Sequence, residues 1–218
     1  MSDYIALSEL KTFLGYSGSG QDDNLNMAID AASRAIDSYC GRFFHQTSLQ
    51  TRYYDCEFPD FADVDDISTT TGLVVKSLQA DGTVDTTYTL NTDYYLYPLN
   101  AASETPAMPF NKIVMAISNS GELLPTGHRK SLSVYAKFGF SAVPEAVKQA
   151  AAIQSSRYWQ RRHSTMGFSG NPETAEAPVI FLSELDPDVQ NLIKHFRVNK
   201  TTLASGRPFV SATTNNYN

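Results

Sequence analysis

The sequence predicts an α+β fold: a helical core of one short helix, two long helices and a C-terminal helix, with an inserted, mainly antiparallel β region and an extended C-terminal tail. Two segments carry this prediction, residues 23–43 and 143–162, because each has an apolar stripe at helical spacing and about a hundred residues of strand and turn pattern separate them. Small residues back both stripes, so the two helices can approach closely; these residues are Ala28, Ala31, Ala32 and Ala35 in one, and Ala146, Ala150, Ala151 and Ala152 in the other.

The N-terminal part predicts a short helix followed by a long one. Ser8 can cap a helix over residues 9–14, which Gly15 ends by adopting a left-handed conformation. After a Gly- and Ser-rich linker, Asp22 or Asp23 caps the long helix and Gly41 ends it. We expect its core face to carry Leu25, Ala28, Ile29, Ala32, Ile36 and Tyr39, and an aromatic residue after Gly41 to fold back beneath the helix.

Residues 48–140 predict the β region. Six segments have strand character, residues 51–55, 73–78, 88–90, 94–98, 112–117 and 131–140. Turn signals at residues 80–82 and 91–93 separate some of them, and prolines gather in one long loop near residues 98–110. The simplest arrangement of these segments is a meander.

The C-terminal part predicts two further helices. Pro144 suits the first position of a long helix that runs to about His163, and a polar loop follows at residues 167–178. Asp186 and Pro187 then open a last helix, whose apolar side carries Val189, Leu192, Ile193 and Phe196. We therefore divide the chain into N-terminal core helices (1–47), β insertion (48–140), C-terminal core helices (141–198) and a tail (199–218).

Composition excludes several classes of protein. The 218 residues carry a formal net charge of −6 and a pI near 5.1, which argues against a protein that coats nucleic acid through a basic face. Cys40 and Cys56 have neither zinc-site nor disulfide-framework spacing, which favours a reduced cytosolic origin. No apolar run is long enough to cross a bilayer, and the first residues lack signal-peptide order, so we expect a soluble chain that is not exported by that route.

None of the motifs predicts a catalytic, cofactor or metal site. The acidic cluster Asp60, Asp63, Asp65 and Asp66 fails the spacing of a calcium loop and favours a solvated turn between strands. The histidines occur singly, and the glycines after the first helix lack the preceding strand that a phosphate-binding loop needs. The chain has no GxSxG nucleophile motif either.

The densest basic and aromatic group lies at the end of the second long helix. It comprises Arg157, Tyr158, Trp159, Arg161 and Arg162. Cations at a helix C-terminus are favoured by the macrodipole alone. Arg and Trp are also enriched at protein interfaces, and contact with nucleic acid is a third interpretation. In the tail, Arg207, Phe209 and Val210 are the candidate anchors.

The order of these features resembles the head-tail connector proteins of tailed bacteriophages, the adaptors that dock on the portal. Three segments carry the resemblance, which extends to about residue 198: residues 32–44 (ASRAIDSYCGRFF), residues 143–150 (VPEAVKQA) and the helix opened by Asp186 and Pro187. None of them is a catalytic signature. A β segment of this length departs from the smaller, all-helical members of such families.

The resemblance implies a structural virion protein and not an enzyme, without cofactors or membrane contact. It implies a homo-oligomeric ring, commonly of about twelve subunits, between the portal protein and the next neck or tail-completion protein. Such a protein is made in the cytoplasm of the bacterial host and resides in the neck of the virion, where genomic DNA passes through the channel at ejection. The helix-end group and the tail are then the candidate portal or subunit interfaces. The acidic net charge suits a channel wall along which DNA slides, in transient and non-specific proximity.

Other functions are compatible with the same residues. The β region could be a carbohydrate-binding module on a helical scaffold, with Tyr94, Tyr95 and Tyr97 as stacking faces, although strand alternation places some of them in a core. Another minor virion protein is also compatible with this order of features.

Overall fold

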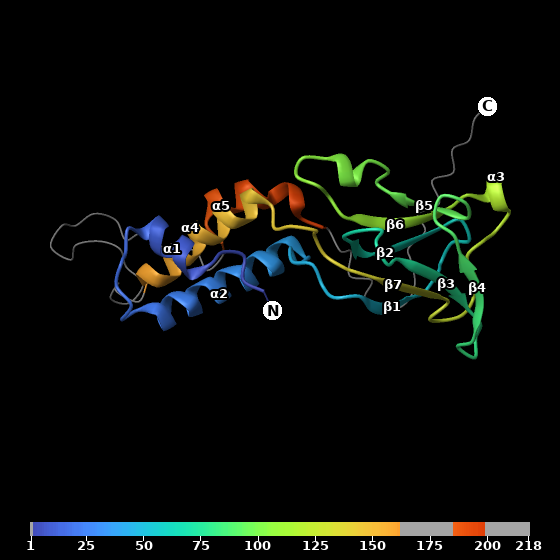
Figure 1. Ribbon diagram of the computed structural model, residues 1–218, viewed down its shortest axis with the longest axis horizontal. Helices are drawn as coiled ribbons and strands as arrows, with labels where there is room; N and C mark the ends of the chain where they lie inside the picture. The colour runs from blue at the N-terminus through green and yellow to red at the C-terminus, as the bar shows by residue number, and fades with distance from the viewer. Residues whose placement is uncertain (1, 162–184, 199–218) are drawn as a thin grey trace, which may run out of the picture.

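The helices from the two ends of the chain gather at one end of an elongated molecule, and the strands, with one short helix, gather at the other (Figure 1). The structure, a computed structural model, describes residues 2–161 and 185–198. The α+β class predicted from the sequence is confirmed, with the helices of both chain ends in one bundle and two antiparallel sheets between them in sequence. No helix in the described ranges is both long and apolar enough to cross a bilayer.

The bundle contains α1 (Leu7–Leu14), α2 (Asp22–Cys40), α4 (Glu145–Arg161) and α5 (Pro187–Ile193), which a 3-10 turn, Lys194–Phe196, extends. Helix α2 packs along α4, as the small-residue stripes predict, and α5 packs on α4 as well. Leu25, Ile29 and Ile36 are buried in the shared core, whereas Tyr39 is only half-buried and Cys40 takes the innermost position at the helix end. The predicted aromatic beneath α2 is Phe44, which is fully buried.

The helix ends correct three predictions by one or two residues. Helix α1 begins at Leu7, so Ser8 lies inside it, and the Ala6 N–H donates to the Glu9 carboxylate at 2.7 Å in place of a Ser cap. Gln21 is the N-cap of α2, which puts Asp22 and Asp23 in the first turn, where acids favour the positive end of the helix. Pro144 precedes α4, and its carbonyl accepts the first helical hydrogen bonds. Asp186 does cap α5, accepting from the Asp188 N–H at 2.7 Å.

Seven strands form the β unit, in two sheets. One sheet has the order β1-β7-β3-β4, with β1 (Gln50–Tyr54), β7 (Leu132–Ala136), β3 (Val74–Leu78) and β4 (Val84–Tyr88). The other has the order β2-β6-β5, with β2 (Phe61–Ile67), β6 (Phe110–Met115) and β5 (Tyr94–Tyr97). A 3-10 turn (Ala101–Ser103) lies in the Pro-rich loop, and the short helix α3 (Ile117–Ser120) follows β6.

This topology contradicts the predicted meander. The chain passes from one sheet to the other, because the strand pattern of a sequence does not specify which strands pair. The turn at residues 80–82 does form the β3–β4 hairpin, with Gly82 at φ 85°. The strand predicted at residues 88–90 lies too late in the chain, because β4 spans Val84–Tyr88 and ends at the first of these residues.

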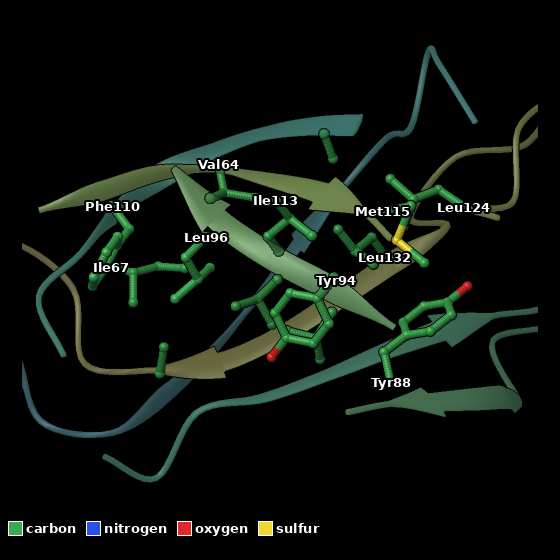
Figure 2. Packing of buried hydrophobic residues seen from close by; sticks show 14 of the residues in the cluster. Val64, Ile67, Tyr88, Tyr94, Leu96, Phe110, Ile113, Met115, Leu124 and Leu132 are labelled. Atoms are coloured by element: carbon green, nitrogen blue, oxygen red, sulfur yellow. The ribbon is translucent and has the colours of Figure 1, made fainter. Parts of the chain in front are cut away.

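The two sheets close on one core, which makes the β unit a sandwich. Side chains from both sheets meet in it, among them Ile113 and Leu96 from one sheet and Leu132 from the other, as Figure 2 shows. Tyr94 belongs to this core and is 1% exposed. The residues on the outer sides of the sheets remain in contact with solvent.

Candidate functional site

The junction between bundle and sandwich is built from two chain segments that run side by side. Residues 41–49 leave α2 for the first strand, and residues 137–144 return from β7 to α4. The Thr47 N–H donates to the Phe138 carbonyl at 2.8 Å, and the Thr47 hydroxyl accepts from the Phe138 N–H at 2.8 Å. The Gly139 N–H donates to the Asp66 carbonyl of β2 at 2.7 Å. Backbone hydrogen bonds therefore fix how the two units meet.

Gly139 is the tightest point of this junction. Its φ of 96° lies in the left-handed region, which disfavours any side chain. A Cβ placed there would lie 1.9 Å from the His45 carbonyl oxygen and 2.8 Å from the Phe43 ring. Glycine is required because the returning segment crosses directly over the outgoing one.

A groove of about 1220 Å³ opens along the junction and is lined by both units. Three arginines reach into it, Arg34 from α2, Arg42 after α2 and Arg52 from β1, and each one has an acidic partner. Val198, the last described residue before the tail, also lines the groove and donates its N–H to the Cys40 carbonyl at 2.8 Å. The described part of the chain therefore ends at this groove.

Two of the ion pairs join separate parts of the molecule. Arg42 and Asp66 link the end of α2 to β2 at 3.3 Å, with side chains only 9% and 13% exposed. Arg52 and Asp65 link the two sheets at 2.8 Å, and the Tyr54 hydroxyl donates to the same carboxylate at 3.2 Å. These contacts hold the bundle and the two sheets in a fixed arrangement.

The N-terminal segment is held at the same junction. The Tyr4 hydroxyl donates to Asp37 of α2 and accepts from the Phe44 N–H at 2.9 Å, while Arg34 pairs with Asp37 at 3.1 Å. Burial, reinforced by the bond to Asp37, raises the pKa of the Tyr4 hydroxyl. Burial also raises the pKa of Asp37, against the opposing effects of Tyr4 and Arg34. Burial lowers the pKa of His45, whose ring lies against Phe43.

The helix-end group predicted as an interface lies far along the bundle from the junction (Figure 1). Arg157 forms an ion pair with Asp186, the cap of α5, and its side chain is 37% exposed. Trp159 packs against the bundle core beside Tyr16, with ring centroids 6.2 Å apart. The Arg161 guanidinium lies 5.8 Å from the Tyr158 ring centre. Arg157 and Trp159 thus serve the bundle itself, and an interface role of the group stays a prediction.

Several predicted residues lie outside the described ranges. These are Arg162, His163, the polar loop at residues 167–178, and the tail with Arg207, Phe209 and Val210.

Only Asp60 of the acidic cluster lies in an exposed bend, so the predicted solvated turn is wrong for the other three acids. Asp63, Asp65 and Asp66 belong to β2 and pair with Lys112, Arg52 and Arg42 respectively. Sequence reasoning missed this strand because its acids dominated the composition, although Ala62, Val64 and Ile67 face inward and could have signalled it. Within the described ranges, no three acidic, His or Cys side chains are grouped to hold a metal ion.

Comparisons with known proteins give a consistent result. Residues 4–79, about a third of the chain and the part from α1 to β3, match the family described as Phage gp6-like head-tail connector protein. No curated protein matches the chain in sequence.

Two solved structures have a similar fold. One is the neck of an empty GTA particle, computed with C6 symmetry, with a TM-score of 0.52. The other is the virion of a native gene transfer agent (GTA) particle, with a TM-score of 0.50. Each is 17% identical to this chain, and the similarity covers 94% of both chains. The resemblance to head-tail connectors is therefore confirmed: residues 4–79 match the Phage gp6-like head-tail connector family, and the chain has the fold of a chain in a GTA neck structure.

Proposed function

We propose that this protein is a structural subunit of the neck of a phage-like virion, where it forms a ring that docks on the portal and links it to the next neck or tail protein. The match of residues 4–79 to head-tail connectors carries the proposal. The matched residues include α1, α2 and residues 41–49, the segment that leads from the bundle into the sandwich. This segment carries Arg42 and also His45, whose carbonyl faces Gly139. The protein acts by assembly and not by catalysis.

The geometry of the junction supports a mechanical role. A connector between two larger assemblies must keep the angle between its parts, and here that angle depends on backbone hydrogen bonds, on the Arg42–Asp66 pair and on the close crossing at Gly139. Every arginine of the groove is already paired with an acid of the same chain. These arginines therefore hold the two units in place and are not free to bind a substrate.

A ring of twelve subunits is the proposed assembly. The neck structure that contains a chain of similar fold was computed with C6 symmetry, and sixfold symmetry is compatible with a ring of twelve subunits. The net charge of −6 suits a channel that DNA traverses without sticking, because like charges repel at short range.

The proposal is tested by mixing the purified protein with portal rings and imaging the particles by negative-stain electron microscopy. We expect an added ring on one end of the portal, with portal-bound protein recovered in a constant ratio. Portal rings that stay bare at saturating concentrations of the protein would overturn the proposal.

Portal contact is proposed for the tail and for the end of α4. Removal of residues 200–218 should weaken portal binding, and binding equal to that of the full chain would refute a role of the tail. For the helix end, Arg161→Glu is the informative variant, because Arg157→Glu would also repel Asp186 and release α5. Unchanged portal binding by Arg161→Glu would leave only the packing role of this group.

The carbohydrate-binding alternative has lost part of its basis. Tyr94 is in the sandwich core, and the hydroxyl of the half-buried Tyr95 accepts from the Asn119 side chain at 2.9 Å. Of these three tyrosines only Tyr97, at 37% exposed, remains open enough to offer a ring face for sugar stacking.

A further inference from the structure

The sandwich presents one outward surface on each of its sheets. Face A consists of the outward side chains of β1, β7 and β3 with the adjoining Lys130 and Lys137, and face B consists of those of β2, β6 and β5 with the adjoining residues 57–60. Because the inner sides of both sheets share one core, the two faces point in opposite directions. A subunit with two unlike, opposite faces has the geometry for head-to-tail contacts.

Face A is basic and aromatic. Strand register places Thr51, Tyr135 and Val74 in one row and Tyr53, Ser133 and Lys76 in the next. Tyr53 is 54% exposed and Tyr135 is 40% exposed, so both rings are available to a partner. The Lys130 amine lies 5.7 Å from the Tyr53 ring centre.

The lysines of face A have no acidic partner in the described part of the chain. Lys76, Lys130 and Lys137 take part in none of its ion pairs. The carboxylate of Asp55, the residue after β1, accepts a hydrogen bond from the Lys130 backbone N–H. Three lysines on one face, outside every ion pair of the described residues and on a chain with net charge −6, favour a contact with acidic groups.

Face B is aromatic with an acidic rim. Register places Phe61, Val114 and Tyr95 in one row and Asp63, Lys112 and Tyr97 in the next. Phe58 stacks on Phe61 with centroids 4.8 Å apart and planes 17° apart, and Phe58 is 46% exposed. The acids here are Glu57 and Asp60, both exposed and outside the ion pairs of the described chain, and Asp63, which pairs with Lys112 but remains 73% exposed.

We propose that face A of one copy of this chain docks on face B of the next copy, an inference that rests on the proposed ring function. Lys76 and Lys137 meet the rim acids Glu57 and Asp60, while Tyr53 and Tyr135 pack against the stacked Phe58 and Phe61. Opposite charges set the register of the contact, and exposed aromatic residues supply the buried area that interfaces favour. Repeated around an axis, this unlike contact closes a ring when the rotation between neighbouring copies is a whole fraction of a turn.

Charge reversal on each face tests the contact. We expect the face A variant (Lys76→Glu with Lys137→Glu) and the face B variant (Glu57→Lys with Asp60→Lys) each to abolish portal-dependent rings and to weaken self-association in sedimentation roughly tenfold or more. Mixed in equal amounts, the two variants should recover ring formation and self-association. Where copies of the two variants alternate, each negative face A meets a positive face B, and each unchanged face A meets an unchanged face B. The matched control is Lys148→Glu with Glu145→Lys, which inverts an exposed 2.7 Å pair of the bundle surface and should change nothing.

The outcomes separate this inference from the proposed function. Normal rings from either reversed variant, or no recovery in the mixture, would show that the faces do not meet. Wild-type protein that leaves the portal bare would refute the neck function, and sedimentation of the free protein would still decide the contact. A third outcome would also overturn the inference. If duplex DNA binds to every protein except the face A variant, and that variant still forms rings, face A is a nucleic-acid surface.

Discussion

The bundle and the sandwich bury cores of the same kind, yet they draw on the chain in opposite ways. The sandwich core comes from one continuous stretch, β1 to β7, whereas the bundle core combines Tyr4 and α2 from the start of the chain with α4 and α5 from its end. We infer that the bundle depends on the sandwich, because the sandwich holds residues 41–49 beside residues 137–144.

The largest expected effect is at the crossing itself. Gly139→Ala forces a Cβ to within 1.9 Å of the His45 carbonyl, so we expect a loss of roughly 4 kcal/mol or more in the free energy of unfolding, or failure to fold. Gly121→Ala is the matched control, because Gly121 also has a positive φ of 74° but no atom within 4 Å of the added carbon, and it should cost about 1 kcal/mol. Urea denaturation measures both. Equal losses would mean that the crossing is not what makes Gly139 necessary.

A pair of core truncations tests the dependence of one unit on the other. Ile36 in the bundle and Ile113 in the sandwich are both fully buried, and each change to Ala should cost about 3 kcal/mol. If the bundle depends on the sandwich, Ile36→Ala should loosen the bundle alone, whereas Ile113→Ala should loosen both units.

The reactivity of the two cysteine thiols can measure the loosening of each unit separately. Cys40 lies in the bundle core and Cys56 in the sandwich core, and burial raises the pKa of the Cys40 thiol to about 12 and raises that of Cys56 as well, so neither should react in the native protein. Alkylation followed by mass spectrometry should find Cys40 alone reactive in Ile36→Ala and both reactive in Ile113→Ala. Equal exposure of both thiols in Ile36→Ala would refute the asymmetry.

The ion pair across the junction should have an intermediate effect. Arg42→Met leaves the carboxylate of Asp66 without its arginine at a position that is 13% exposed, which should cost about 2 kcal/mol. Lys148→Met removes one partner of an exposed pair, which solvent screens, and should leave stability almost unchanged. Thermal unfolding measures both variants, and similar costs would argue against a special role of the junction pair.

The smallest effect concerns pH. Because burial lowers the pKa of His45 in the folded protein below its usual 6.5, the unfolded chain takes up a proton first as the pH falls. Stability should therefore decline from about pH 6.5 downward, and His45→Gln should reduce that decline. Asp37 faces the same groove and its raised pKa acts in the opposite direction, so the comparison must be made between the variant and the wild type at each pH. Identical pH profiles would show that His45 does not contribute.

Much of the helical part was predictable because its signals are local. Gly15 and Gly41 end their helices with φ values of 64° and 67°, and Asp186 caps α5, since each of these roles depends on a few neighbouring residues. Strand β2 was missed because its inward residues are interrupted by acids. Their partners, Arg42 and Arg52, lie at other places in the chain, so the pairs are not visible as a motif.

By itself, the sequence determined the α+β class, the helix pair split by strands, and the resemblance of residues 4–79 to head-tail connectors, because apolar period, small-residue stripes and end signals are local properties of the chain. Only the tertiary structure decided which strands pair, that two sheets close into a sandwich, and that Arg157 serves α5 through Asp186. Those outcomes depend on contacts between residues far apart in sequence. Such contacts form where the burial of shared apolar surface outweighs the entropy of closing the intervening loops, a balance that no single segment encodes.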